Sequence, residues 1–186
     1  MSKSLLKSGL IGGLVVFIWG LISWMILPWH HQCFHSFKHE ERVASVIKDN
    51  APTRGMYIIP YTFSHDENSS SAEMNRSMEK MENGPFVFAA VVPEGFGLRG
   101  VKPLLFSFFF QVIGALILSW IFLQSKGLTL KKKVWMGCLF GIGVSVLGVF
   151  PAWNWVGFSL GYVMMNLVDL VIGWSLAGYV LARVSK

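Results

Sequence analysis

Long runs of apolar residues alternate with polar segments along this chain of 186 residues. The runs cover 5–27, 104–123, 134–150 and 158–182. Crossing about 30 Å of hydrocarbon takes about 20 helical residues, so each run matches, or nearly matches, one membrane span. Pro103 precedes the second run and Pro151 follows the third, which are positions that helix geometry tolerates. The pattern therefore predicts a first span within 1–27 and three more within 103–186.

The first run has a second interpretation, a cleaved signal peptide. Its apolar stretch is longer than a usual signal core, and the following residues, "MILPWHHQC", contain no small-x-small cleavage site. The residues before Cys33 do not form a lipoprotein box either. We therefore expect the first run to be retained as a membrane helix.

The polar segment 28–102 shows shorter periodic patterns. Apolar residues in "HSFKHEERVASVIKDNAP" recur at helical spacing until Asn50 and Pro52 end the helix. Two β-prone stretches, "GMYIIPYTF" and "GPFVFAAVVP", predict two short strands. The polar stretch 64–84 between them predicts a mobile loop, with a short helix over 72–82 in its second half. We expect this segment to form a small α/β cap at the outer mouth of the helices.

Composition supports lipid as part of the solvent. Hydrophobic residues make up 53% of the chain and charged residues 14%, whereas soluble domains carry about 25% charged residues. The net charge of +6 does not indicate nucleic-acid binding, because the cations flank the apolar runs and form no separate basic face. We expect an all-α integral membrane protein, a four-transmembrane-helix bundle with a small extracytoplasmic α/β cap between its first two helices.

The positive charges predict an orientation. Cations without acids flank one side of the four runs: Lys3, Lys7, Lys126, Lys131, Lys132, Lys133, Arg183 and Lys186. Because lysine and arginine gather on the cytoplasmic side, both termini should be cytoplasmic and segment 28–102 should face outward. Tryptophans favour the bilayer boundary and agree with this layout, with Trp153 and Trp155 at the outer level and Trp120 and Trp135 at the inner one.

Asp169 is the candidate functional residue, because it lies near the middle of the last apolar run. Tyr162 and Asn166 share its helical face, and Gln111 of the second span should lie at comparable depth, with Ser145 and Trp19 somewhat nearer the outer side. No Lys, Arg or His lies deep in a span, so we expect a largely protonated acid that donates a hydrogen bond to Gln111 or Asn166. This intramembrane polar cluster is either a clamp that fixes helix register or a site that handles protons or cations. The second alternative requires a cavity that reaches Asp169 from one side.

Four histidines fall between His30 and His39. On a continuous helix, His31, His35 and His39 would stack at intervals of four residues, a spacing that suits two imidazoles on one metal ion. Weak Zn²⁺ or Cu²⁺ binding is one alternative, and an interfacial helix with solvated imidazoles is the other. No catalytic motif is present, so we expect a non-enzymatic protein without a tightly bound cofactor. Cys33 and Cys138 are expected to be free thiols.

Small residues at four-residue spacing predict close helix packing within the membrane. They occur in the last two spans as Gly137, Gly141, Gly173 and Ala177. Ordinary packing within the bundle and a dedicated face for self-association are both compatible with this spacing.

Three stretches carry a resemblance: "SWMILPWH", "NAPTRGMYIIP" and "WNWVGFSLGYVMMNLVDLVIGW". Together they resemble an uncharacterised family of small four-span bacterial inner-membrane proteins. The resemblance implies a multi-pass protein of the bacterial inner membrane, and it carries no activity. The pattern it implies comprises Trp24, Pro28, His30, Trp153, Asn154 and Asp169.

Three functions remain as hypotheses. The first is an accessory, assembly or stabilising subunit of a larger inner-membrane system, whose partners are other membrane subunits. The second is a small oligomeric transporter or proton-coupled permease centred on Asp169. The third is an outward-facing metal-binding protein that uses the His30–His39 helix.

Overall fold

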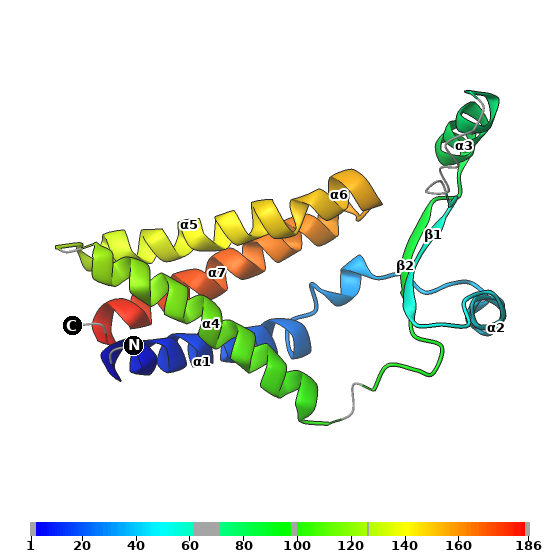
Figure 1. The fold of residues 1–186 in the computed structure, drawn as a ribbon. Helices are drawn as coiled ribbons and strands as arrows, with labels where there is room; N and C mark the ends of the chain where they lie inside the picture. Colours follow the sequence, from blue (N-terminus) through cyan, green and yellow to red (C-terminus); the bar gives the residue numbers. More distant parts are fainter. Residues whose placement is uncertain (1–2, 62–70, 98–99, 126, 185–186) are drawn as a thin grey trace. The chain divides into compact units, whose positions relative to one another are not determined.

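The computed structural model describes residues 3–61, 71–97, 100–125 and 127–184 (Figure 1). The chain divides into two compact units, and each is treated by itself below. The helical unit comprises Met1–His35 and Leu98–Lys186, and the smaller unit comprises Ser36–Gly97.

Long helices dominate the helical unit: α1 (Lys3–Met25), α4 (Lys102–Gln124), α5 (Leu130–Gly148) and α7 (Leu160–Val184). A short 3₁₀ turn, η1 (His31–Cys33), follows α1, and the seven-residue α6 (Phe150–Val156) follows α5. Within the described parts of the chain, four helical stretches are long and apolar enough to cross a membrane, with α5 and α6 forming one stretch, Leu130–Val156. This confirms the four predicted apolar helices.

Local chemistry explains where the third helical stretch begins and ends. The sequence pattern placed its start at the first continuous apolar residues, but α5 begins at Leu130. Thr129 is the reason, because its side chain accepts a hydrogen bond from the backbone N–H of Lys132 (3.4 Å) and caps the helix. Pro151 lies in the first turn of α6, where it needs no N–H partner. Gly157 ends α6 in the left-handed conformation, at φ 74°.

The helical unit packs in the order α5, α7, α1, α4, with α4 running diagonally across α1 in Figure 1. The apolar core comprises Val16, Ala115, Leu118, Phe122, Trp174, Ala177 and Leu181. Its members come from α1, α4 and α7, and Met136 and Phe140 of α5 pack against them. The core therefore holds together the N-terminal half of α5 and the C-terminal halves of α4 and α7.

The predicted small residues lie where the helices approach each other. A Cβ atom built on Gly141 would lie 2.6 Å from the backbone oxygen of Leu170, and Gly137 faces the backbone of Trp174 in the same way. Gly173 instead faces the ring of Trp19 on α1, and Ala177 is fully buried. Gly137 and Gly141 therefore let α5 and α7 pack backbone to backbone, as small residues do between membrane helices.

The smaller unit contains α2 (Glu40–Asn50), β1 (Gly55–Ile59), α3 (Ser71–Asn83) and β2 (Val87–Val91). The two short strands that the sequence pattern predicted are present, and they pair antiparallel with Gly55 opposite Val91 and Ile59 opposite Val87. The predicted helix over 72–82 is present as α3, so the mobile loop over 64–84 is wrong for this part; residues 64–70 lie outside the described residues.

The first helix of the smaller unit starts later than its apolar pattern suggested. Phe34 and Phe37 continue the helical spacing, yet α2 begins only at Glu40. Glu40 and Glu41 fill its first turn, where negative side chains favour the helix N-terminus. Residues 34–37 adopt no regular structure, so the continuous helix expected through the histidine cluster is wrong.

Candidate functional site

The chain after α1 folds back over α7. Helix α1 ends at Met25, and the backbone N–H of Cys33 then donates to the His30 carbonyl (3.1 Å) within the turn that contains η1. Cys33 Sγ lies 3.8 Å from Met165 Sδ, and the ring of Phe34 packs edge-to-face on Tyr162 at 5.8 Å. These contacts fix the turn against the first half of α7, the part of the helix that carries Asp169.

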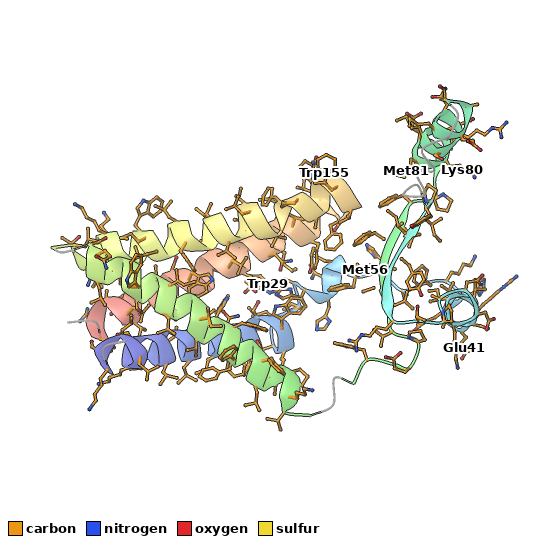
Figure 2. The ribbon with its side chains drawn as sticks, in the orientation of Figure 1. Trp29, Glu41, Met56, Lys80, Met81 and Trp155 are labelled. Atoms are coloured by element: carbon orange, nitrogen blue, oxygen red, sulfur yellow. The ribbon has the colours of Figure 1, made fainter. Side chains whose placement is uncertain are left out.

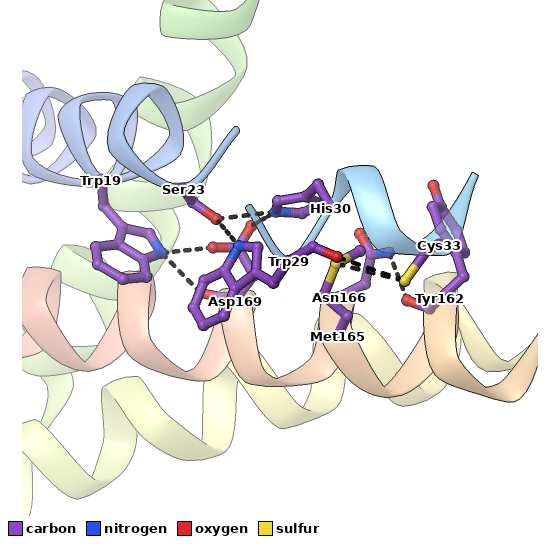
Figure 3. Close-up of polar contacts among 9 residues, drawn as sticks. All are labelled: Trp19, Ser23, Trp29, His30, Cys33, Tyr162, Met165, Asn166 and Asp169. Atoms are coloured by element: carbon purple, nitrogen blue, oxygen red, sulfur yellow. Dashed lines mark hydrogen bonds and ion pairs between the residues drawn. The ribbon is translucent and has the colours of Figure 1, made fainter. Parts of the chain in front are cut away.

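Asp169 receives its main hydrogen bond from Trp19 of α1. The indole N–H donates to Asp169 Oδ1 at 2.7 Å and also lies 3.1 Å from the backbone oxygen of the same residue (Figure 3). The second carboxylate oxygen lies 3.7 Å from His30 Nε2, which is longer than a hydrogen bond and short enough for an ion pair when the imidazole is protonated. The side chain of Asp169 keeps 13% exposure, so the carboxylate is still accessible.

His30 is held by aromatic and hydroxyl groups (Figure 3). Its side chain is 1% exposed and stacks on Trp24, with ring centroids 3.8 Å apart. Ser23 Oγ lies 2.9 Å from His30 Nε2 and accepts the indole N–H of Trp29 at 3.0 Å. His30 Nδ1 is buried and has no hydrogen-bond partner among the described residues.

Burial sets the charge state of His30. Removal of the imidazole from water lowers the pKa of His30 below its usual 6.5, the nearby Asp169 carboxylate partly opposes this, and the neighbouring His31 lowers the pKa further. The neutral imidazole is therefore favoured at neutral pH, and it leaves the accessible carboxylate of Asp169 without a full positive charge beside it.

A cavity of about 330 Å³ reaches this carboxylate between α1, α4 and α7. Asp169, Asn166, Gln111 and Ser107 are its polar lining residues. Apolar and aromatic residues line the remainder: Val16, Phe17, Trp19, Gly20, Leu21, Trp24, Met25, Leu104, Leu170 and Gly173. Met25 at the C-terminal end of α1 and Leu104 at the N-terminal end of α4 are lining residues that are themselves exposed.

The predicted polar cluster is therefore arranged differently from the expectation. Gln111, Asn166 and Asp169 do line one cavity, but the expected hydrogen bond from Asp169 to either amide is replaced by the one from Trp19. The amide nitrogen of Asn166 donates to the backbone oxygen of Tyr162 at 2.8 Å, so the backbone of Tyr162 contacts the cluster. The expectation that no basic side chain reaches Asp169 is also wrong, because His30 does.

The histidine cluster does not assemble as the metal hypothesis required. His31 lies in η1, His35 in the irregular stretch after it, and His39 immediately before α2, so the three do not share a helix face. The described residues contain no group of three histidine, cysteine or acidic side chains able to hold a metal ion. Cys33 and Cys138 are free thiols, as predicted.

Sequence reasoning placed Trp19 near the depth of Asp169 without predicting their hydrogen bond, and it missed Ser23 and His30 as neighbours of this acid. His30 precedes the 3₁₀ turn and belongs to no span, so its depth could not be judged from the hydrophobic runs. A signal was nevertheless available, since Trp24, His30 and Asp169 all belong to the pattern that the resemblance implied. Trp24 stacks on His30, and His30 faces Asp169.

Fold and site together define a small helical protein with four candidate membrane-spanning stretches in its described part, with an accessible acid in a cavity between three of them. Comparison with protein-family models, with curated proteins and with solved structures found no match to this chain.

Proposed function

We propose that this protein is a small proton-coupled permease of a bacterial inner membrane, with Asp169 as its functional residue. The cavity that reaches Asp169 carries this proposal, because a solute pathway must bring both solute and proton to the same acid. A carboxyl group inside a hydrocarbon environment is costly and is a functional-site hypothesis by default. Asn166, Gln111 and Ser107 supply further polar contacts along the wall of this cavity.

The helix packing supports a cavity of this kind. Small residues bring α5 and α7 together, whereas the polar wall forms where α1, α4 and α7 leave a space between them. Trp19 orients the carboxylate through a hydrogen bond to one oxygen, and the second oxygen lies 3.7 Å from His30 Nε2, which is longer than a hydrogen bond. The second oxygen can therefore contact a proton or a solute while the first stays anchored on α1.

Transport by the isolated protein tests this function. The full chain is reconstituted in vesicles with a pH gradient reported by an internal pH-sensitive dye. Benzyltrimethylammonium, phenylalanine and benzenesulfonate are added in turn, because they share a phenyl ring and differ in charge. At least one should collapse the gradient about tenfold faster with wild type than with Asp169→Asn, since the amide can accept from Trp19 but cannot exchange a proton.

Asp49→Asn is the matched control, because it makes the same substitution on α2 in the smaller unit. It should transport like wild type. Equal rates in wild-type, Asp169→Asn and protein-free vesicles for all three solutes would reject the permease.

A second candidate, an accessory subunit of a larger membrane system, is supported by the surface of α3. Met74, Met78 and Met81 lie on one face of this helix with exposures of 48%, 59% and 41%, and Figure 2 shows Met81 beside Lys80. Neither α2 nor α3 has a buried residue in the structure. Flexible methionine side chains on an exposed helix face suit contact with another protein.

The subunit hypothesis predicts a partner that depends on this methionine face. Purification from native membranes in mild detergent should recover a membrane protein in a fixed ratio to wild type and to Ala72→Glu, which adds charge at an exposed position on the opposite face of α3. Met78→Glu should lose that protein. Equal recovery of the partner with both variants would show that the methionine face of α3 does not bind it. Transport activity of the isolated protein would favour the permease over the subunit hypothesis.

We also propose that both termini are cytoplasmic and that the smaller unit faces outward, on the basis of the lysine distribution. Single cysteines at positions 71 and 131 test this orientation in a Cys33→Ser/Cys138→Ser background. A membrane-impermeant maleimide added outside should label Ser71→Cys in intact cells and should label Lys131→Cys only after permeabilisation. Labelling of both in intact cells would overturn the layout.

A further inference from the structure

The residues that line the cavity at Asp169 indicate which class of ligand it can bind. We propose that it binds a small organic cation, with the Asp169 carboxylate as the counter-ion and the aromatic rings of Trp19, Trp24 and Phe17 around the apolar part. The inference rests on the proposed permease, because it gives the class of solute that the same cavity would carry. It can be tested separately, because binding and transport are different measurements.

Charge is the first argument. Asp169 is the only acid among the described residues that line the cavity, and no lysine or arginine is among them. The nearest basic group, His30, lies behind the carboxylate, and burial lowers its pKa so that the neutral form is favoured. A bound anion would be repelled by the Asp169 carboxylate, because no lining cation offsets that charge. A neutral solute would leave the carboxylate without a counter-ion, whereas a cation would pair with it.

The remaining polar groups favour a ligand that donates hydrogen bonds or carries positive charge. Asn166 donates one amide N–H to the Tyr162 carbonyl, which leaves its amide oxygen and a second N–H for a ligand. Trp19 uses its indole N–H on Asp169, so its ring offers the cavity a π-system and no free donor. Gln111 and Ser107 can donate as well as accept, so the preference for a cation rests on the Asp169 carboxylate, to which the Asn166 and aromatic groups add.

The aromatic residues supply the second part of the recognition. One face of the Trp24 ring is covered by His30, and the ring still lines the cavity with 43% exposure. A cation near an indole ring is attracted by the negative face of the ring, and the attraction grows when water is excluded. The volume of about 330 Å³ lies at the lower end of small-molecule cavities, so the ligand should be small.

Coupling to protons follows from the single carboxyl group. A protonated Asp169 cannot act as counter-ion, so a proton and a cation compete for the same carboxylate. When a cation displaces a proton, the O–H bond breaks, the proton goes to solvent and the carboxylate pairs with the cation, so one positive charge enters the cavity as one leaves it.

Binding of benzyltrimethylammonium to the full-length protein in detergent tests the inference, with isothermal titration calorimetry as the measurement. Wild type and Asp49→Asn should bind it equally, and Asp169→Asn should bind it about tenfold or more weakly, because the buried counter-charge is lost. Benzenesulfonate should compete poorly. Equal affinity of wild type for both probes, or unchanged binding of the cation to Asp169→Asn, would overturn the inference.

A cavity-filling variant keeps the test valid if Asp169→Asn fails to fold. Gly20 lines the cavity, and a Cβ atom built there meets nothing within 4 Å, so Gly20→Leu adds a side chain to the space without a clash at Cβ. This variant should keep the thermal stability of wild type and lose the cation. Retained binding in Gly20→Leu would place the ligand elsewhere and reject this cavity.

The outcomes separate the two proposals. Cation binding without any transport in vesicles would keep this inference and reject the permease. Transport of phenylalanine or benzenesulfonate without cation binding would keep the permease and reject the cation.

Discussion

Replacing Gly141 by alanine is expected to destabilise the protein by about 2 kcal/mol. The new Cβ would lie 2.6 Å from the Leu170 oxygen, 2.9 Å from the Leu170 carbonyl carbon and 3.0 Å from Val171 Cα. All three are backbone atoms, so no rotamer change can relieve the overlap, and α5 must move away from α7. The midpoint of denaturant-induced unfolding in detergent, followed by circular dichroism, measures the loss.

Gly143 supplies the matched control for this prediction. It lies two residues further along α5, and a Cβ atom built there meets nothing within 4 Å. Gly143→Ala should therefore be neutral or slightly stabilising, because alanine favours the helix over glycine. Equal destabilisation by the two substitutions would mean that α5 and α7 do not approach at Gly141.

Replacing His30 by alanine is expected to cost about 2–4 kcal/mol of stability. The imidazole is 1% exposed, fills the space beside the Trp24 ring and bonds to Ser23, so its removal leaves both a void and a hydroxyl without its partner. His31→Ala is the control, because this neighbouring side chain is exposed. The difference between their thermal unfolding midpoints in detergent is the measurement, and equal midpoints would contradict the buried position of His30.

The same residue predicts a dependence of stability on pH. Because burial lowers the pKa of His30 in the folded state, the unfolded chain binds a proton more readily than the folded one. The contribution of the neutral imidazole is fully present above the unfolded pKa of about 6.5. It is lost as pH falls from there through the lowered folded value. In His30→Ala this part of the pH profile should be flatter, whereas a profile that matches wild type would assign the effect to another group.

The sequence predicted the helices better than it predicted their ends. Hydrophobic runs located all four long apolar helices, but the start of α5 depended on the Thr129 cap and not on the first apolar residue. The start of α2 was missed for a similar reason, because the pattern of Phe34 and Phe37 continued beyond the helix that formed. Helical spacing reports which residues could share a face, and capping decides which of them join the helix.

The candidate site was predicted in part. Asp169 was singled out correctly as an acid deep in an apolar run, and Gln111 and Asn166 do share its cavity. Its actual hydrogen-bond donor, Trp19, was expected somewhat nearer the outer side than Asp169, and the amides of Gln111 and Asn166 were preferred as partners. The indole N–H becomes a specific donor only when a neighbouring helix places an acceptor beside it.

By itself, the sequence determined that this chain forms long apolar helices, because length, composition and hydrogen bonds within each helix suffice for that. Only the tertiary structure decided which polar groups meet, since Trp19 and Asp169 are 150 residues apart in the chain. The turn after α1 carries His30 back onto α7, and the packing of α1, α4 and α7 leaves the cavity open. Both depend on how separate segments cross in space, which no local pattern of residues records.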